Sequence, residues 1–236
     1  MNAAPRSGPT TSAEVRLLCT QALRTSLLEL APRFEAATRH RLILAIAPSG
    51  KLVQRVRSGE PADVLIANAP NIDALIEEKL VVGSRTDIAR AEVGLAIKAG
   101  AMRPDIATPD AVKRALLEAR AVAYVAGGLS GTLFELALEK LGIADEVRRK
   151  AINGSPAARY VVSGEADLAA QQISELIAVE GAQLLGPMPA SLEVMTQFSA
   201  GILAGANDAT AAQDLIAFLQ NAEAQAVIAA KGLTPG

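Results

Sequence analysis

The stretch RLILAIAPSGKLVQRVRSG, residues 41–59, contains an apolar run, a turn and an amphipathic pattern in immediate succession. The apolar run is short and rich in aliphatic residues, which is typical of a buried strand. Pro48, Ser49 and Gly50 interrupt it. Gly59 closes the helical pattern that follows. The stretch therefore predicts one strand–turn–helix unit.

The segments on either side repeat this unit. The run at 14–19 (EVRLLC) predicts a strand, and apolar residues at helical spacing predict a helix over 20–38. A third unit has a strand at 62–68 and a helix at 71–81, with Asn71 suited to its first turn. The order β-α-β-α-β-α is typical of a largely parallel sheet with helices on both faces.

A second α/β group follows after residue 90, and one strand and two helices finish the chain. Its predicted strands lie at 91–100, 121–126, 166–172, 182–189 and 194–205, and its predicted helices at 108–119, 132–142, 144–152 and within 208–232.

These groups predict two α/β lobes, each a mostly parallel sheet flanked by helices. We expect one lobe from residues 13–90 plus 197–236, a second from 91–196, and a disordered tail over 1–12. The chain would cross between the lobes twice, on two crossover strands. Ligands of open α/β sheets bind beyond the carboxyl ends of the strands, so a cleft between the lobes is the expected site.

The composition argues against several classes of protein. The 236 residues carry a formal net charge of −2, only 3% are aromatic and none is Trp, so we expect no nucleic-acid partner. The single cysteine, Cys19, lies in an apolar run and is interpreted as a small buried hydrophobe. The single histidine, His40, stands between two arginines and is expected at the surface at a helix end. One Cys and one His make no zinc cluster, and we expect neither metal nor cofactor.

No run of about 18 apolar residues occurs, so no membrane span is expected. The first residues, MNAAPRSGPTTSAE, lack the apolar core that a secretory signal requires. Either the protein stays in the cytoplasm or its signal has been removed, and the sequence leaves both open.

Small polar residues follow four of the predicted strands. They occupy 20–22, 48–51, 127–131 and 171–174. Ser and Gly before a helix suit an anion site, because the first turn leaves N–H groups unpaired and its dipole favours negative charge. For Ser49 and Ser130 the alternative is a simple helix N-cap.

Charged residues near these loops have two interpretations. Lys51 and Arg159 are either solvated or directed into the cleft, and Glu175 either forms a salt bridge or faces the cleft. Asp63 is expected to be a turn or cap residue. No carboxylate pair or nucleophile elbow is evident, so the chain is predicted not to be an enzyme.

Four segments together resemble the periplasmic molybdate-binding proteins of ABC transporters, which have the type II periplasmic solute-binding fold. They are VRLLCTQALRTSLLELAPRFE (15–35), APSGKLVQRVRSGEPADVLIAN (47–68), SGTLFELALEKLGIADEV (130–147) and GEADLAAQQISELI (164–177). The resemblance implies two α/β lobes with two crossover strands that close over a ligand.

The resemblance also implies a set of ligand residues. A first-loop serine of that family corresponds to Ala22 here, and a second serine corresponds to Ser49. Backbone donors correspond to Ser130 and to Gly154–Ser155, and a tyrosine is replaced by Gln172. The full expected set, including neighbours in the same loops, is Gln21, Ala22, Ser49, Gly50, Lys51, Ser130, Gly131, Gly154, Ser155 and Gln172.

The resulting hypothesis is a monomeric solute-binding protein that captures an oxyanion or a small organic acid for an ABC transporter permease, periplasmic by the resemblance. A second hypothesis is an isomerase of a small polycarboxylate, such as aconitate, on the same scaffold, with Lys51, Tyr160 or Glu175 as proton-transfer group. A third is a cytoplasmic anion sensor or carrier.

Overall fold

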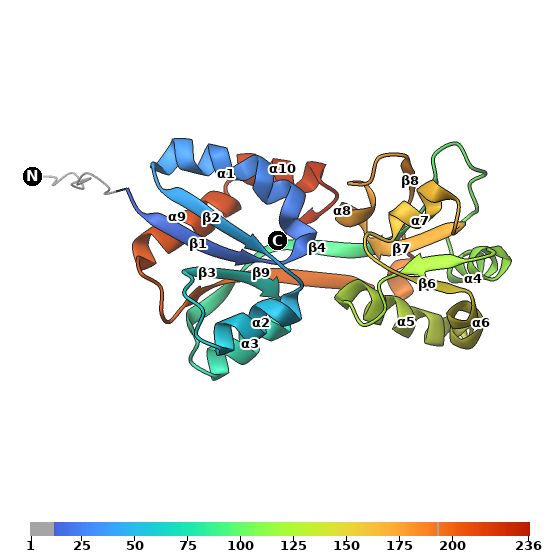
Figure 1. Cartoon of the computed structure of the whole chain (residues 1–236), viewed down its shortest axis with the longest axis horizontal. Coiled ribbons are helices and arrows are strands. Elements are labelled where there is room, and N and C mark those ends of the chain that lie inside the picture. Colours follow the sequence, from blue (N-terminus) through green and yellow to red (C-terminus); the bar gives the residue numbers. More distant parts are fainter. Residues whose placement is uncertain (1–11, 193) are drawn as a thin grey trace, which may run out of the picture.

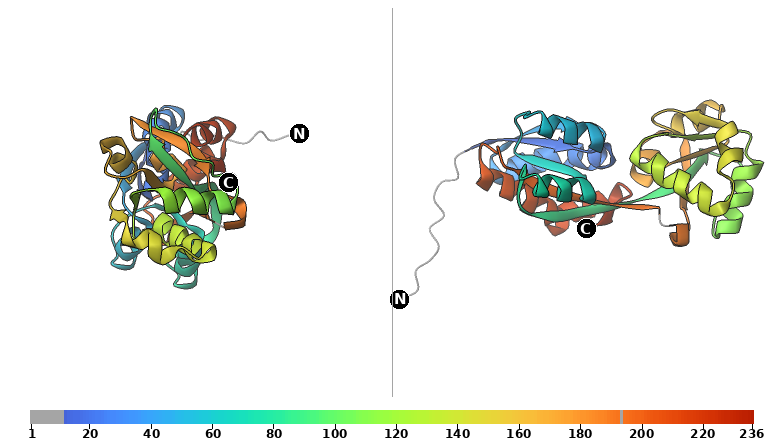
Figure 2. Two further views of the ribbon diagram at one scale, coloured as in Figure 1. Left: turned by 90° about the vertical axis from the view of Figure 1, so that its right-hand side faces the viewer. Right: turned by 90° about the horizontal axis from the view of Figure 1, so that it is seen from below.

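The structure is a computed structural model that describes residues 12–192 and 194–236. The expected disordered tail therefore lies outside the described residues, apart from Ser12. Two α/β lobes lie end to end, and the views in Figure 1 and Figure 2 show strands passing from one lobe to the other. The α/β class and the two-lobed arrangement are as predicted.

Ten strands are present in the described chain: β1 (Glu14–Cys19), β2 (Arg41–Ile46), β3 (Val64–Asn68), β4 (Val81–Lys98), β5 (Val122–Tyr124), β6 (Ala151–Asn153), β7 (Leu168–Gln172), β8 (Ala182–Pro187), β9 (Met195–Leu203) and β10 (Thr234–Pro235). The α-helices of the same part are α1 (Arg24–Thr38), α2 (Ser49–Arg57), α3 (Ala69–Glu77), α4 (Pro109–Glu118), α5 (Leu129–Leu141), α6 (Ala144–Arg149), α7 (Ala158–Ser163), α8 (Ile173–Leu176), α9 (Ala209–Gln220) and α10 (Ala222–Ala230). Two 3₁₀ turns are η1 (Gln21–Leu23) and η2 (Ala190–Leu192).

Each lobe has three parallel strands at its centre. In the first lobe the order is β2-β1-β3, and in the second it is β7-β5-β6. Strands β4 and β9 add antiparallel to these, β9 beside β3 and β4 beside β7. The carboxyl ends of β1, β2 and β3 therefore share one edge, and that edge faces the second lobe.

Strand β4 links the two sheets. Its residues from Val81 to Glu92 pair with β9, whereas those from Val93 onward pair with β7 and β8. The strand predicted at 91–100 begins instead at Val81, because β9 holds the polar residues before residue 91 by backbone hydrogen bonds. Register shifts after Val82 and after Asp87 accommodate them. The lobe boundaries themselves stay a proposal.

Helix starts differ from the predictions in three places. Helices α2 and α5 begin at Ser49 and Leu129, so both candidate serines lie inside a first helical turn. Helix α3 begins at Ala69, ahead of the predicted start at residue 71. The predicted helix at 144–152 ends at Arg149, and the next residues form β6 because they pair in parallel with β5.

Both faces of each sheet are covered. In the first lobe, α1, α9 and α10 pack on one face and α2 and α3 on the other, around two separate apolar clusters. The second lobe likewise has one cluster under α4, α5 and α6 and another under α7. Cys19 is fully buried in the first cluster, as predicted, and burial raises the pKa of its thiol well above the usual range.

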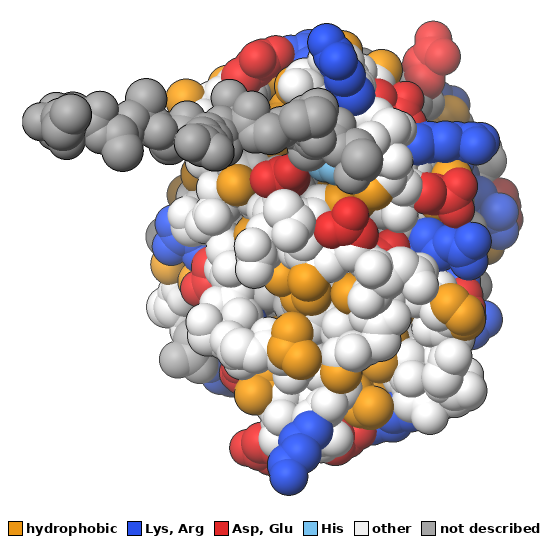
Figure 3. Space-filling view, turned by 90° about the vertical axis from the view of Figure 1, so that its left-hand side faces the viewer, with side chains coloured by type: hydrophobic (Ala, Val, Ile, Leu, Met, Phe, Trp, Pro, Cys, Tyr) orange, Lys and Arg blue, Asp and Glu red, His pale blue; other side chains and the backbone are white. Residues whose placement is uncertain are grey.

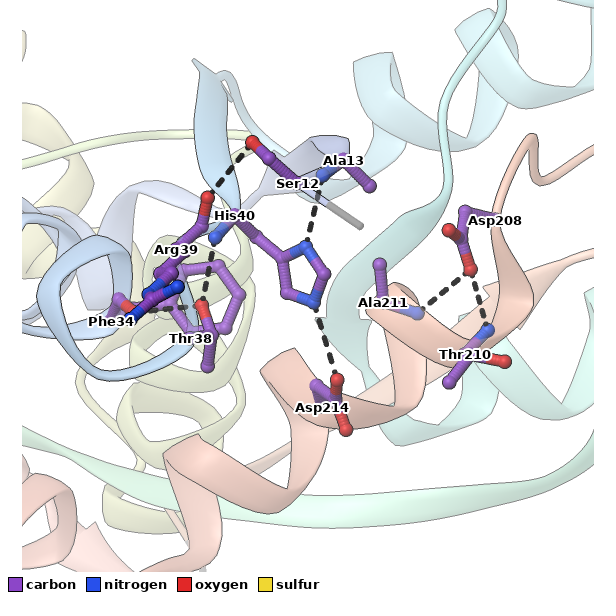
Figure 4. A network of polar contacts seen from close by, with 10 residues as sticks. All are labelled: Ser12, Ala13, Phe34, Thr38, Arg39, His40, Asp208, Thr210, Ala211 and Asp214. Carbon is purple, nitrogen blue, oxygen red and sulfur yellow. Dashed lines mark hydrogen bonds and ion pairs between the residues drawn. The ribbon is translucent and has the colours of Figure 1, made fainter. Parts of the chain in front are cut away.

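His40 is buried, so its predicted surface position was wrong. Arg39 adopts a left-handed conformation, with φ of 62°, and this turns the next residue inward. The His40 ring lies between two elements, with Nδ1 accepting from the Ala13 N–H at 3.1 Å and Nε2 at 3.2 Å from Asp214 Oδ2 (Figure 4). The ring also stacks on Phe34. His40 thereby joins the start of β1 to α9.

Asp63, just before β3, connects this strand to β1 and to the loop after β9. Its side chain is buried, with Oδ2 accepting from the Arg16 N–H and Oδ1 from the Asn207 N–H, both at 2.7 Å. It is thus a bridge between β1 and the loop after β9, which corrects the predicted turn or cap role. Because both donors are backbone groups, the position requires an acceptor at each oxygen.

The end of the first lobe seen in Figure 3 mixes acidic and basic side chains around small apolar areas. This face therefore presents no extended field of one sign. Within the described residues, none of the helices combines the length and the apolar character that crossing a bilayer would require.

The Asp63 bridge yields a stability prediction. Asp63→Asn places an amide N–H₂ against one of two backbone donors, and we expect the free energy of unfolding to fall by about 2–4 kcal/mol. Urea unfolding followed by circular dichroism measures it. As a control, Asp145→Asn changes a side chain that is 83% exposed and should alter stability by less than about 0.5 kcal/mol. Equal effects of the two substitutions would contradict the bridge.

The His40 contacts predict a tautomer. The Ala13 N–H can only donate, so Nδ1 must accept and the proton of the neutral ring must lie on Nε2. Long-range ¹H–¹⁵N NMR under alkaline conditions should show the Nε2–H form. The chain has one histidine, so assignment is unambiguous. An Nδ1–H ring would contradict the contact with Ala13.

Candidate functional site

A cleft of about 690 Å³ lies where the two lobes meet. The first lobe contributes the ends of β1 and β3 and the first turns of α2 and α3. The second contributes the first turn of α5 and the junction of β7 with α8. The lining residues are Thr20, Gln21, Pro48, Ser49, Gly50, Lys51, Gln54, Asn68, Asn71, Val125, Gly127, Gly128, Leu129, Ser130, Thr132, Ser155, Gln171, Gln172 and Glu175.

The wall formed by the first lobe contains an unpaired donor. Ser49 is the first residue of α2, after the N-cap Pro48, and its buried Oγ has no hydrogen-bond partner within the described chain. Lys51 follows two positions later and is exposed. In the adjacent helix, Asn71 Nδ2 donates to Asn68 Oδ1 at 2.6 Å. Hydroxyl, amide and ammonium donors thus share this wall.

The wall formed by the second lobe is built around α5. Gly128 is the N-cap of α5, and Ser130 lies buried in its first turn. Thr132 Oγ1 donates back to the Gly128 carbonyl at 3.0 Å. Proline at one N-cap and glycine at the other provide no side-chain cap, so the first N–H groups of α2 and α5 are open to a ligand. The alternative of Ser49 and Ser130 as N-caps is therefore wrong.

The helix ends make the cleft attractive to an anion. The first turns of α2, α3 and α5 all line it, and each helix dipole places partial positive charge there. Among the described lining residues, Lys51 and Glu175 are the charged side chains. With both ionised they cancel, so the helix ends and the uncharged donors determine the electrostatic character.

Glu175 occupies an unusual position for a carboxylate. It lines the cleft on α8, and burial raises its pKa to about 7, although a hydrogen bond from Gln171 acts in the opposite direction. Gln171 Nε2 donates to Glu175 Oε2, and Gln171 Oε1 accepts from the Ala157 N–H at 2.8 Å. A carboxyl group that titrates near neutrality can hold or release a proton under physiological conditions.

The structure brings seven of the ten expected residues to the cleft and leaves three behind its lining. The seven are Gln21, Ser49, Gly50, Lys51, Ser130, Ser155 and Gln172. Ala22 is buried in the first-lobe core. A Cβ on Gly131 would lie 1.9 Å from the Val125 carbonyl, and one on Gly154 would lie 2.1 Å from the Tyr160 hydroxyl. Both glycines are therefore explained by close packing.

Several cleft residues were not predicted. Gln54, Asn68, Asn71, Val125 and Thr132 line the cleft without having been placed there. Asn71 was noticed only as a residue for a helix start. A usable signal did exist, because Asn68 is the polar last residue of a buried strand, as Gln172 is, and Thr20 directly follows another. Within the described chain, no group of three or more His, Cys, Asp or Glu could hold a metal ion.

Comparison with known proteins places the chain in a family. Residues 15–234 match the family described as bacterial extracellular solute-binding protein. The chain belongs to this family. The Azotobacter vinelandii periplasmic molybdate-binding protein has the same fold, with a TM-score of 0.78, 19% identity, and coverage of 94% of this chain and 99% of that one.

Two characterised proteins are similar to this chain in sequence. The aconitate isomerase of a Pseudomonas species is 32% identical over 218 residues, which cover 89% of this chain and 83% of that protein. The molybdate-binding protein ModA of Azotobacter vinelandii is 26% identical over 231 residues, covering 94% and 90%. One relative is an isomerase and the other a binding protein, so family membership alone does not choose between these activities.

Proposed function

We propose that this chain is a solute-binding protein that captures a small anion, an oxyanion or an organic acid, in the cleft between its lobes. The observation that carries the proposal is the buried, unpaired Ser49 Oγ at an uncapped helix start, opposite Ser130 at another. Similarity to a periplasmic molybdate-binding protein and to the substrate-binding domain of a putative molybdenum ABC transporter supports an ABC transporter permease as partner and the periplasm as location.

Anion capture follows from the physics of this cleft. Unpaired buried donors are unfavourable until an acceptor arrives, and an anion supplies several acceptors at once. The helix N-termini would repel a cationic solute, and a neutral solute would form weaker hydrogen bonds with these donors than an anion does. The same donors suit tetrahedral oxyanions and carboxylates, so the proposal covers both classes.

Ser49→Ala tests the proposal. Thermal shift with molybdate, tungstate, sulfate, citrate and trans-aconitate should identify a stabilising anion, and calorimetry should then give its affinity. Loss of one hydrogen bond to a charged ligand should weaken binding roughly 10- to 100-fold.

Ser26→Ala is the matched control. Ser26 Oγ is also buried without a partner among the described residues, but it lies in α1 outside the cleft lining. Both substitutions should change unfolding stability similarly, and only Ser49→Ala should reduce affinity. The absence of stabilisation by every anion in the panel at millimolar concentration would overturn anion capture.

A second candidate function is isomerisation of a small unsaturated polycarboxylate. It is favoured by the 32% identical aconitate isomerase and by Glu175, a carboxyl group in the cleft with a pKa of about 7. Ionised Glu175 would remove a proton from the methylene carbon of aconitate. The electron pair would shift into an allylic anion, and the proton would return to the other allylic carbon, so no oxidant or water is needed.

Proton NMR of trans-aconitate incubated with the protein tests this candidate. Conversion to cis-aconitate should occur, and Glu175→Gln should lower its rate at least about 100-fold. Glu180→Gln, at an exposed glutamate outside the cleft lining, should leave the rate unchanged. Complete stability of trans-aconitate over a day would reject the isomerase candidate and leave anion capture standing.

A further inference from the structure

Glu175 lies on a short helix, α8, at the place in the cleft where elements of both lobes meet. Helix α8 packs against β4, β7, β8 and η1, so it contacts elements of both lobes. Gln172, the residue before α8, pairs with Val93, where β4 leaves the first sheet for the second. A carboxylate here faces any anion held between the lobes.

The orientation of Glu175 is set by a short hydrogen-bond chain. The Ala157 N–H can only donate, so the Gln171 atom that it meets must be the amide oxygen. The Gln171 nitrogen is therefore the atom that donates to Glu175 Oε2. Glu175 Oε1 has no hydrogen bond or ion pair within the described chain, so it is the oxygen left free for a further hydrogen bond.

The surroundings of Glu175 contain few charges that could balance it. Strands β7 and β8 and turn η1 carry no charged residue. On β4 the nearest charged positions are Arg90, which donates to the Pro235 carbonyl, and Glu92. Lys231, in the segment packed on α8 through Gly232, pairs with Glu29.

The remaining charges come from α7 and from across the cleft. On α7, Arg159 donates to the Tyr160 hydroxyl. Lys51 on α2 lines the opposite wall. Neither forms a hydrogen bond or ion pair with Glu175 in the described chain. No direct cationic partner therefore holds Glu175 in its ionised form, and burial alone raises its pKa to about 7.

An anion in the cleft changes this balance further. A negative charge near a carboxylate disfavours ionisation of the carboxylate. Because Oε2 accepts from Gln171, the added proton belongs on Oε1, where it becomes a donor toward the ligand. Protonation also takes the charged cleft side chains, Lys51 and Glu175, from a net charge of zero to +1.

We propose, on the basis of the anion-binding function above, that Glu175 enters the complex protonated and donates Oε1–H to the bound anion, with Gln171 as its positioning residue. Where Glu175 is ionised in the free protein, each anion captured is then accompanied by one proton, which Glu175 takes from solvent. Protonated Glu175 leaves Lys51 as the charged side chain among the described lining residues. Glu175 thereby contributes to specificity, because the cleft then favours anions over neutral solutes.

The affinity for the anion should depend on pH above about pH 7. Below about pH 7 Glu175 is already protonated in the free protein, and affinity is independent of pH as far as this residue is concerned. Above that pH the free protein must take up a proton to bind. Affinity should therefore fall about tenfold for each further pH unit, until the pH reaches the pKa that Glu175 has in the complex.

Isothermal titration calorimetry with molybdate, sulfate and trans-aconitate tests the proposal between about pH 6 and pH 9 in buffers of different ionisation enthalpy. These probes are fully ionised over that range, so a proton taken up belongs to the protein. Near pH 8 the wild type should take up about one proton per anion. Glu175→Gln, which keeps a neutral donor, should still bind but take up none, and Glu180→Gln should match the wild type.

Gln171→Met tests the positioning role. Loss of the Nε2–H donor removes the contact that favours ionised Glu175, so the midpoint of the affinity–pH curve should move to higher pH. A purely structural role would lower thermal stability and leave the midpoint unchanged, which would overturn the positioning assignment.

Three outcomes separate the two levels of proposal. Binding without proton uptake, with affinity constant over the pH range, overturns the Glu175 proposal and leaves anion capture intact. Proton uptake that persists in Glu175→Gln also overturns it, because another group must then be responsible. Failure of these three probes, and of tungstate and citrate, to bind even at about pH 6 overturns anion capture and the Glu175 proposal together.

Discussion

The backbone pairing of β4 with β9 is the constraint on which the architecture depends. These strands hydrogen-bond from Val81 to Glu92, and β4 then continues into the second sheet without a break. A continuous strand fixes the direction of both sheets relative to one another. It therefore brings the helix starts of the first lobe to face those of the second, and a cleft rich in backbone donors results.

The cleft combines features that separately would be unremarkable. A helix start, a serine and a partly buried glutamate occur in many folds, and each has a purely structural explanation. Here the N-caps are Pro48 and Gly128, which provide no side-chain acceptor, and the Ser49 hydroxyl is left buried and unpaired. Donors on both walls face one cleft, and the charges of its described ionisable lining residues, Lys51 and Glu175, cancel when both are ionised. That combination favours anion capture, and Glu175 makes the site sensitive to protons.

The periodicity of the sequence predicted the α/β class, the two lobes and most of the elements, because a strand–turn–helix unit is a local signal. It also located the loops that reach the cleft. Pairing partners are not local. Only the apolar end of β4 was therefore predicted as a strand, and the first residues of β6 were predicted as part of a helix. Burial set by a single turn is equally hard to predict, since His40 points inward only because Arg39 adopts a left-handed conformation. The role of Glu175 depends on Gln171 and Ala157, which meet only in the folded chain.

The last described residues lie against the strand that joins the lobes. Strand β10 pairs with Ala89 and Arg90 of β4, and the Gly236 N–H donates to the Ile88 carbonyl at 3.1 Å. The start of β1, by contrast, lies at the outer end of the first lobe (Figure 1). A fluorophore or tag attached at Gly236 would thus sit beside the strand that links the two lobes. An attachment ahead of Ser12 would report on one lobe only, which makes the two ends of the chain unequal sites for a sensor.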